Sequence, residues 1–183
     1  MGFAIPVSLM RHDPAWVQAA ERYSAIILAS TPNVIAVHHI GSTGIKGIKA
    51  KPVIDLMPIV SNLMILDEQA DRIEALGYVW RGEFGGDGRR FCTLDDAKGV
   101  RQAQLHIYET GSPHARRQLA FREYLRAHPA IAKDYSAEKE RASALHPHNS
   151  HAYSAEKGDW IRAVEAAALN WFGTTSASKT SLI

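Results

Sequence analysis

The chain has 183 residues, the length of one domain that can bury a substantial core. Apolar residues make up 46% and charged residues 22%, as in ordinary soluble globular proteins, and the net charge of +2 is too small to indicate a nucleic-acid partner. The single cysteine, Cys92, excludes an intrachain disulfide and a cysteine-rich zinc site.

The segment Met1–Arg11 lacks the charged start and the long apolar core of a signal peptide, and no apolar run has the length needed to cross a bilayer. We therefore expect a cytoplasmic protein that does not contact a membrane. The basic residues are too dispersed to predict specific nucleic-acid recognition, and the sequence leaves the oligomeric state open.

The first half of the chain alternates predicted helices with short β-rich segments. Asp13-Pro14 caps the first helix, in which apolar residues recur at helical spacing, and Gly77 ends the second helix. Glycine-containing turns separate the last three strands. In chain order, we predict a helix at 15–29, strands at 34–40 and 52–60, a helix at 63–76, and strands at 78–80, 90–94 and 102–108.

The second half of the chain is predicted to be helical, with breaks at two proline-containing segments. The Ser- and Thr-rich end, 174–183, is expected to be a disordered tail. The complete pattern predicts a single α+β domain over 1–173, with a mixed β-sheet and a helical C-terminal half. The predicted helices cover 114–127, 131–145 and 152–172, and the breaks lie at 128–129 and 146–149.

The segment 38–60 carries the most chemical information. It is predicted to form a strand, a Gly41-Ser42 turn, a basic connection containing Lys51, and a second strand with Asp55. Glycine lets the backbone approach a bound group, and free amide N–H groups in such a turn suit a phosphate. Asp55 could hold a metal ion for that phosphate. The alternative interpretation is a tight turn capped by Ser42, with Asp55 in an ion pair with a lysine or arginine.

The predicted strand 102–108 places Gln104, His106 and Tyr108 on one face and apolar residues on the other. These polar-capable side chains could line a cleft beside Asp55. Alternatively, they belong to a sheet face that simply meets water.

Basic residues at several positions could capture phosphate or could form a solvated surface. Arg90 and Arg122 belong to arginine clusters, and Arg122 is one helical turn before Arg126. The pairs Tyr135/Lys139 and Tyr153/Lys157 each place an ammonium group and a phenol on one helix face. Either pair could point into a cleft or outward to solvent.

Taken together, these residues resemble the GrpB family, which is grouped with the nucleotidyltransferase-fold proteins related to polymerase beta. The resemblance runs from near residue 7 to about residue 172, and the order and spacing of its motifs are specific. The residues that carry it are Asp13-Pro14-x-Trp16, Ile40-Gly41-Ser42-Thr43, Ala50-Lys51-Pro52-Val53-Ile54-Asp55, Leu105-His106, Phe121-Arg122-x-Tyr124-Leu125-Arg126-x-His128-Pro129, Tyr135-x-x-x-Lys139 and Tyr153-x-x-x-Lys157.

The resemblance implies a nucleotidyltransferase-like mixed sheet flanked by helices. In that superfamily, a Gly-Ser turn precedes two carboxylates on the next strand, which with a third acid hold two metal ions. Asp55 matches the first carboxylate, which implies Mg²⁺ at this residue. Met57 stands at the second position, and a thioether cannot replace an oxygen ligand. Gln104 stands where the family commonly has the first histidine of His-x-His, and no carboxylate precedes Glu109 on that strand.

The leading hypothesis is a nucleotidyltransferase-like protein that acts on or binds a nucleotide or another phosphorylated small molecule, with an acceptor that the sequence does not name. Asp55 would hold Mg²⁺ and would act in catalysis together with His106. The residues expected to bind the nucleotide or its phosphates are Gly41, Ser42, Thr43, Lys51, Arg90, Arg122, Lys139, Tyr153 and Lys157.

Two alternatives remain open. The first is a non-catalytic module on the same fold that binds a nucleotide or a coenzyme A-type compound; similar domains occur attached to dephospho-CoA kinase in some bacteria. The second is a different reaction in the same cleft, with His106 as general base and Asp55 orienting its imidazole.

Overall fold

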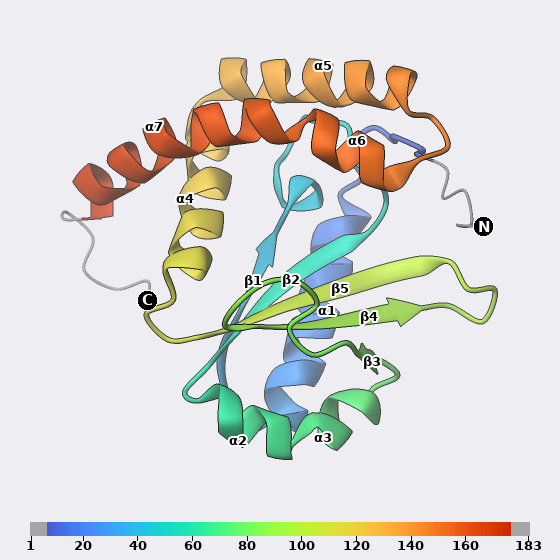
Figure 1. Cartoon of the computed structure of the whole chain (residues 1–183), viewed down its shortest axis with the longest axis vertical. Helices are drawn as coiled ribbons and strands as arrows, with labels where there is room; N and C mark the ends of the chain where they lie inside the picture. Colours follow the sequence, from blue (N-terminus) through green and yellow to red (C-terminus); the bar gives the residue numbers. More distant parts are fainter. Residues whose placement is uncertain (1–6, 177–183) are drawn as a thin grey trace.

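The computed structural model describes residues 7–176 and shows a mixed α+β fold (Figure 1). The predicted α+β class with a helical C-terminal half is confirmed. The strands are β1 (Val34–Ile40), β2 (Ile54–Val60), β3 (Val79–Trp80), β4 (Arg89–Asp95) and β5 (Arg101–Glu109). The helices are α1 (Ala15–Ser30), the short 3₁₀ turn η1 (Ser42–Gly44), α2 (Leu63–Glu68), α3 (Ala70–Glu74), α4 (Pro113–Ala127), α5 (Pro129–Leu145), α6 (Ser150–Glu156) and α7 (Gly158–Ser176).

The described strands form one five-stranded sheet in the order β1-β2-β5-β4-β3. The pairs β1–β2, β4–β5 and β3–β4 are antiparallel, whereas β2 and β5 run parallel. This order makes β2 and β5 central neighbours, and it places Asp55 directly opposite Gln104. The two strands on which the sequence predicts polar site residues therefore lie side by side.

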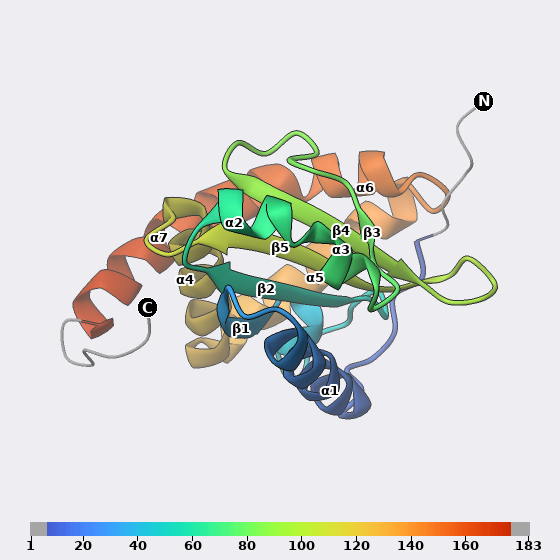
Figure 2. The same cartoon turned by 90° about the horizontal axis from the view of Figure 1, so that it is seen from below.

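Helices α1, α2 and α3 cover one face of the sheet. Figure 2 shows α2 and α3 in front of the sheet and the C-terminal helices behind it. Alternate residues of the central strands, such as Leu56 and Leu105, are fully buried on this face against Trp16 and Ile27 of α1. Asn62 begins α2 by accepting hydrogen bonds from two backbone N–H groups. This layer forms the largest part of the hydrophobic core.

The opposite face of the sheet meets α4 and α7. Met57 and Tyr108 are buried there against Leu119 of α4 and Phe172 of α7. Ser112 caps α4, its side chain accepting a hydrogen bond from the backbone N–H of Ala115 at 3.4 Å. The apolar packing occupies one end of this face, and the other end is left for polar residues.

Two predicted helices are each divided in the structure. The helix expected at 63–76 bends at Gln69, whose N–H bonds to the carbonyl of Leu66 in a tighter turn. The helix expected at 152–172 is interrupted at Lys157, directly before Gly158, a residue with low helix propensity. Helix α7 then continues to Ser176, past its predicted end, and the rest of the predicted tail, 177–183, lies outside the described residues.

Within residues 7–176, no helix combines the length and the apolar character required to span a membrane.

Candidate functional site

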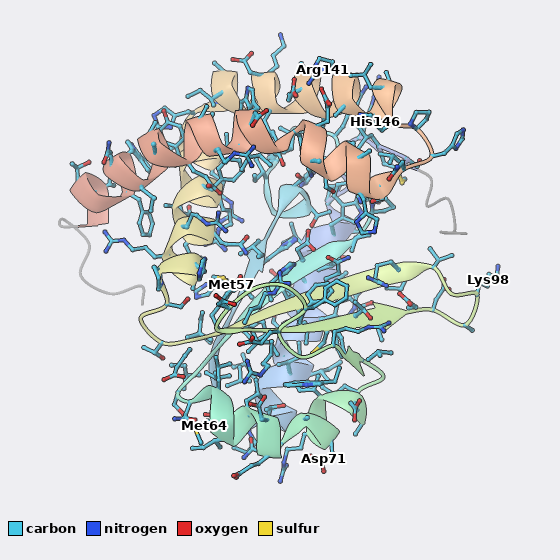
Figure 3. All side chains as sticks on the ribbon, in the orientation of Figure 1. Met57, Met64, Asp71, Lys98, Arg141 and His146 are labelled. Atoms are coloured by element: carbon cyan, nitrogen blue, oxygen red, sulfur yellow. The ribbon has the colours of Figure 1, made fainter. Side chains whose placement is uncertain are left out.

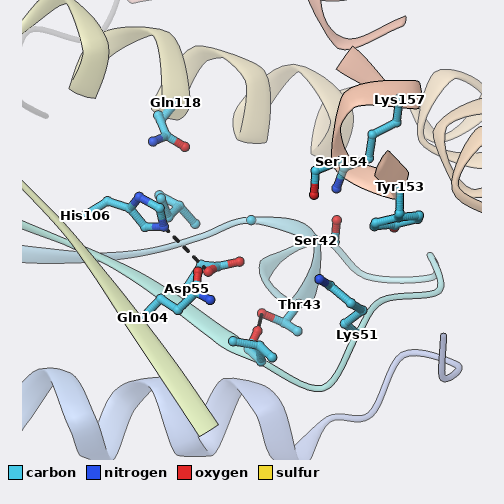
Figure 4. Close-up of a pocket in the computed structure, with 13 residues that line it drawn as sticks. Ser42, Thr43, Lys51, Asp55, Gln104, His106, Gln118, Tyr153, Ser154 and Lys157 are labelled. Atoms are coloured by element: carbon cyan, nitrogen blue, oxygen red, sulfur yellow. Dashed lines mark hydrogen bonds and ion pairs between the residues drawn. The ribbon is translucent and has the colours of Figure 1, made fainter. Parts of the chain in front are cut away.

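A pocket of about 280 Å³ lies between the second face of the sheet and the C-terminal helices (Figure 4). The end of β1, the start of β2 and the middle of β5 form one wall, while α4, α6 and the α6–α7 junction form the other. The pocket is lined by Ile40, Gly41, Ser42, Thr43, Lys51, Val53, Asp55, Gln104, His106, Gln118, Tyr153, Ser154 and Lys157. Most of the predicted site residues are therefore brought together here.

Asp55 lies on the sheet side of this pocket, with 28% of its side chain exposed. With the Gln104 amide nitrogen facing it, Asp55 Oδ1 accepts a hydrogen bond at 3.3 Å, and the Gln104 oxygen accepts one from Arg101 Nη1 at 3.2 Å. His106 Nε2 is 3.7 Å from Asp55 Oδ1. Within residues 7–176, the partners of Asp55 are thus an amide and an imidazole, and not the lysine or arginine of a structural ion pair.

His106 presents only one ring nitrogen to the pocket side. Its Nε2 faces Asp55, whereas its Nδ1 is buried and finds no hydrogen-bond partner among the described residues. The ring of Phe91 packs beside the imidazole at 5.2 Å between centroids. This geometry suits an imidazole that supports the Asp55 carboxylate, and it gives Nδ1 no route to a bound molecule.

Gly41 brings the backbone of the turn against Asp55. Its φ of 68° and ψ of −173° fall in a region that glycine adopts almost alone. A Cβ at this position would lie 3.0 Å from the Cβ of Asp55 and would overlap its Oδ2. The sequence predicted that this glycine lets the backbone approach a bound group; in the structure its close neighbour is Asp55, and both residues line the pocket together with Ser42.

The side chain of Thr43 links the Gly41-Ser42 turn to two neighbouring segments. Its hydroxyl lies 2.9 Å from His39 Nε2 and donates to the carbonyl of Val53 at 3.4 Å. Burial, with a smaller contribution from the Arg126 charge, lowers the pKa of His39 to about 4, so this imidazole is neutral at pH 7. Thr43 therefore joins η1 to β1 and to the segment before β2.

Lys51 and Lys157 are far apart in the sequence, but both line the pocket, and both ammonium groups lie over the ring of Tyr153. Their Nζ atoms lie 5.4 and 4.7 Å from the centre of the Tyr153 ring, which is 1% exposed. Burial lowers the pKa of both lysines, the nearby Lys157 charge lowers that of Lys51 further, and Asp55 opposes both shifts. Figure 4 shows the lysines and Asp55 around the same space.

Three predicted phosphate ligands lie elsewhere. Arg90 pairs with Asp67, with Nη2 2.6 Å from Oδ2. Arg122 donates from Nη1 to the carbonyl of His39 at 2.8 Å. Lys139 is 1% exposed and donates to the carbonyl of Lys49. Each of these groups is held by a protein partner, and none of the three lines the pocket.

Two polar residues that line the pocket were not predicted from the sequence. Gln118 projects from α4, and Ser154 follows Tyr153 on α6 (Figure 4). Gln118 is one helical turn before Arg122, so the same helix-face argument that selected Arg122 could have selected it. Ser154 carries no signal beyond its position next to Tyr153.

The residues present do not fit a two-metal centre. Met57 is fully buried, and Figure 3 places it where α4 meets the sheet. In the described part of the chain, Asp55 is the one carboxylate lining the pocket, and no group of three or more histidine, cysteine, aspartate or glutamate side chains is arranged to hold a metal. A single Mg²⁺ at Asp55 would need its other ligands from bound phosphates and water.

Residues 6–167 match the protein family described as "GrpB protein". The chain belongs to the GrpB family. The Bacillus subtilis UPF0157 protein YqkA is 37% identical over 90% of this chain and 48% of its own length. The crystal structure of the conserved protein GrpB from Enterococcus faecalis has a TM-score of 0.83 at 34% identity, and the match covers 90% of this chain and 99% of that chain. The predicted family and its fold are confirmed.

The GrpB region also occurs within longer proteins. Dephospho-CoA kinase from Mycobacterium leprae is 27% identical over 93% of this chain and 48% of the kinase. The chain thus spans about half the length of that kinase and of the Bacillus protein. A structure of Cid1 in complex with its short product ApU has a TM-score of only 0.46 at 12% identity, covering 73% of this chain and 44% of that chain, which supports no conclusion about chemistry.

Proposed function

We infer that this protein binds the phosphate groups of a nucleotide or another phosphorylated small molecule in the Asp55 pocket. The observation that carries this inference is the convergence of Lys51 and Lys157 on one space with the Gly41-Ser42 turn. These two lysines are far apart in the sequence and already partly desolvated. A bound phosphate would compensate the positive charge of both lysines. Its oxygens would also replace the interactions with water that the ammonium groups lose on burial.

A reaction in this pocket would centre on Asp55. In a nucleotidyltransferase-like reaction, an acceptor hydroxyl forms a bond to the α-phosphate of a nucleoside triphosphate, the bond between the α- and β-phosphates breaks, and pyrophosphate leaves. Asp55 would accept the proton of the hydroxyl while Lys51 and Lys157 hold the phosphates. Gln104 would orient Asp55 through the hydrogen bond from its amide nitrogen to Oδ1 at 3.3 Å, with His106 Nε2 next to the same oxygen at 3.7 Å. Magnesium, when bound, would supply charge neutralisation between Asp55 and the phosphates.

A second candidate function is binding without catalysis. It is favoured by the single pocket carboxylate and by Met57, which lies in the apolar layer where the superfamily pattern has a metal ligand. The similarity to the M. leprae dephospho-CoA kinase adds coenzyme A-type compounds to the ligands that such a module would recognise. These compounds share phosphates and a nucleotide base with nucleoside triphosphates.

The distinguishing experiment is a thermal-shift panel of nucleoside triphosphates, dephospho-CoA and coenzyme A, each with and without Mg²⁺ or Mn²⁺. A ligand that binds only the folded state raises the melting temperature once its concentration exceeds its Kd. A metal-dependent shift that Asp55→Asn removes, with the fold intact, favours the transferase. A shift that is indifferent to chelator and to Asp55→Asn favours the binding module.

Removing either lysine should weaken binding of whichever compound shifts the melting temperature. We expect Lys51→Met and Lys157→Met each to raise Kd about tenfold or more, because each deletes a charge-assisted contact to phosphate. Binding should also weaken as pH rises towards the ordinary lysine pKa, because burial lowers the pKa of both groups. Isothermal titration calorimetry at several pH values measures both effects.

Lys98→Met is the matched control for the lysine variants. Lys98 is exposed at the tip of the β4–β5 hairpin, away from the pocket (Figure 3). Equal losses for Lys98→Met and the pocket variants would show a non-specific charge effect. Unchanged affinity in both pocket variants would contradict the proposed phosphate site.

A further inference from the structure

A row of contacting aromatic side chains leads from His106, which lines the pocket, to Phe91 and Phe84. On the neighbouring strand β4, Phe91 is paired directly with His106, so both side chains lie on the same face of the sheet. The next residue, Cys92, points to the opposite face and is buried in the main core. Phe91 therefore belongs to the face that carries Asp55, Gln104 and His106, one strand further from β2.

Phe84 lies over Phe91 and faces solvent. The two rings are stacked, with centroids 5.3 Å apart and planes inclined by 18°. Phe84 nevertheless remains 63% exposed, and its φ of 46° is unusual for a bulky side chain. A large apolar ring that is exposed on a strained backbone is a feature found at ligand-binding sites.

Hydrogen bonds within the β3–β4 loop hold Phe84 in place. Arg89 Nη2 donates to the carbonyl of Phe84 at 2.6 Å and to that of Glu83 at 3.2 Å, and its guanidinium lies 5.0 Å from the centre of the Phe91 ring. The Phe91 N–H donates to the carbonyl of Gly82 at 2.8 Å. Figure 2 shows this loop and α6 towards the same side of the molecule. The exposed ring is therefore presented by a loop that its own hydrogen bonds hold, and it is linked to the pocket through Phe91 and His106.

We propose that the exposed ring of Phe84, supported from beneath by the buried ring of Phe91 and next to it by His106, binds the planar base of a nucleotide whose phosphates lie at Lys51 and Lys157. This inference rests on the proposed function and names the ligand class for the same site. Strand β5 lies between β2 and β4. Because adjacent strands are about 4.8 Å apart, β2 and β4 are separated by roughly 10 Å, which is comparable to the length of a nucleotide. Every base offers a flat face for stacking, so this surface favours nucleotides over inorganic phosphates with little preference among bases.

Calorimetric titration of the full chain with ATP, GTP, CTP, UTP and inorganic tripolyphosphate tests this surface. We expect the triphosphates to bind at least about fivefold more tightly than tripolyphosphate, because stacking adds to phosphate binding. Phe84→Ala should weaken triphosphate binding by a similar factor and should leave tripolyphosphate unchanged. Phe84→Trp, which keeps a stacking ring, should retain the preference.

The control is Met64→Ala, which removes a side chain of similar size that is 74% exposed on α2. Equal affinities for triphosphates and tripolyphosphate, or equal weakening of both in Phe84→Ala, would overturn the base surface while leaving the phosphate site standing. If neither class of compound binds, the proposed function fails and this inference fails with it. An effect of Phe84→Ala on self-association, with nucleotide affinity unchanged, would show that the ring contacts protein instead.

Discussion

At the residue scale, Gly41 and Asp55 depend on each other. Gly41 has the backbone conformation that turns the chain out of β1, and its missing side chain leaves room for the Asp55 carboxylate. Ile40, just before the turn, is paired with Asp55 across β1 and β2. The position of the carboxylate is thus set by a strand pair on one side and by a glycine on the other.

We expect Gly41→Ala to destabilise the protein and to abolish ligand binding. The backbone conformation alone should cost about 1–3 kcal/mol, and the contact with Asp55 should add about 1 kcal/mol or more. Gly47→Ala is the control, because Gly47 also has a positive φ of 85°, whereas a Cβ added there would meet no other part of the protein within 4 Å. Urea denaturation of both variants measures the difference, and equal losses would contradict the contact with Asp55.

At the scale of elements, α5 fixes the segment that leads to Lys51. Ser136 Oγ accepts from the backbone N–H of Lys49 at 3.1 Å, Lys139 donates to the carbonyl of Lys49, and Glu140 pairs with the Lys49 ammonium at 2.8 Å. Side chains on one helix therefore satisfy the N–H, the carbonyl and the charge of a single residue. Lys51 follows shortly after this residue and enters the pocket.

The stability contributed by Lys139 should depend on pH. Burial, with a smaller contribution from Lys157, lowers the pKa of Lys139 from 10.5 to about 7. The folded state therefore binds fewer protons than the unfolded state between these values, and wild type should gain stability relative to Lys139→Met as pH rises through this window. Denaturant titrations from pH 6 to pH 10 measure the effect. A constant difference would contradict it, and Lys133→Met, an exposed position on α5, is the control.

At the scale of the whole molecule, the pocket joins the two halves of the chain. The sheet supplies the Gly41-Ser42 turn, Asp55 and His106, while α6 and its junction with α7 supply Tyr153 and Lys157. Neither half contains both the carboxylate and the full set of pocket cations. A ligand that contacts both halves of the chain should therefore stabilise both halves against local unfolding.

Hydrogen exchange should detect this coupling. With ATP bound, we expect slower amide exchange both at 41–45 and at 150–158, because the ligand contacts both halves and opposes their local opening. The hairpin tip, 96–100, should exchange at an unchanged rate because it lies away from the pocket. Protection confined to one half would contradict a ligand that bridges them.

The sheet side of the site was predictable because its determinants are local. Alternation along a strand places Asp55 and His106 on defined faces, and a Gly-Ser pair after a strand predicts a turn. The same reasoning could not find Phe84, because its exposure and its stacking on Phe91 depend on how the β3–β4 loop folds back. The same reasoning could not predict that the helix is interrupted at Lys157. The signal there is Gly158, and a single glycine is tolerated within many helices.

The sequence by itself determined the family, the α+β class and the carboxylate, imidazole and turn that form the sheet side of the pocket. Only the tertiary structure decided which distant cations reach it. Lys139 and Lys157 follow tyrosines at the same spacing, yet Lys157 lines the pocket whereas Lys139 donates to the backbone of Lys49. The physical reason is that spacing defines which residues share a helix face, while the packing of the helix against the sheet decides what that face meets.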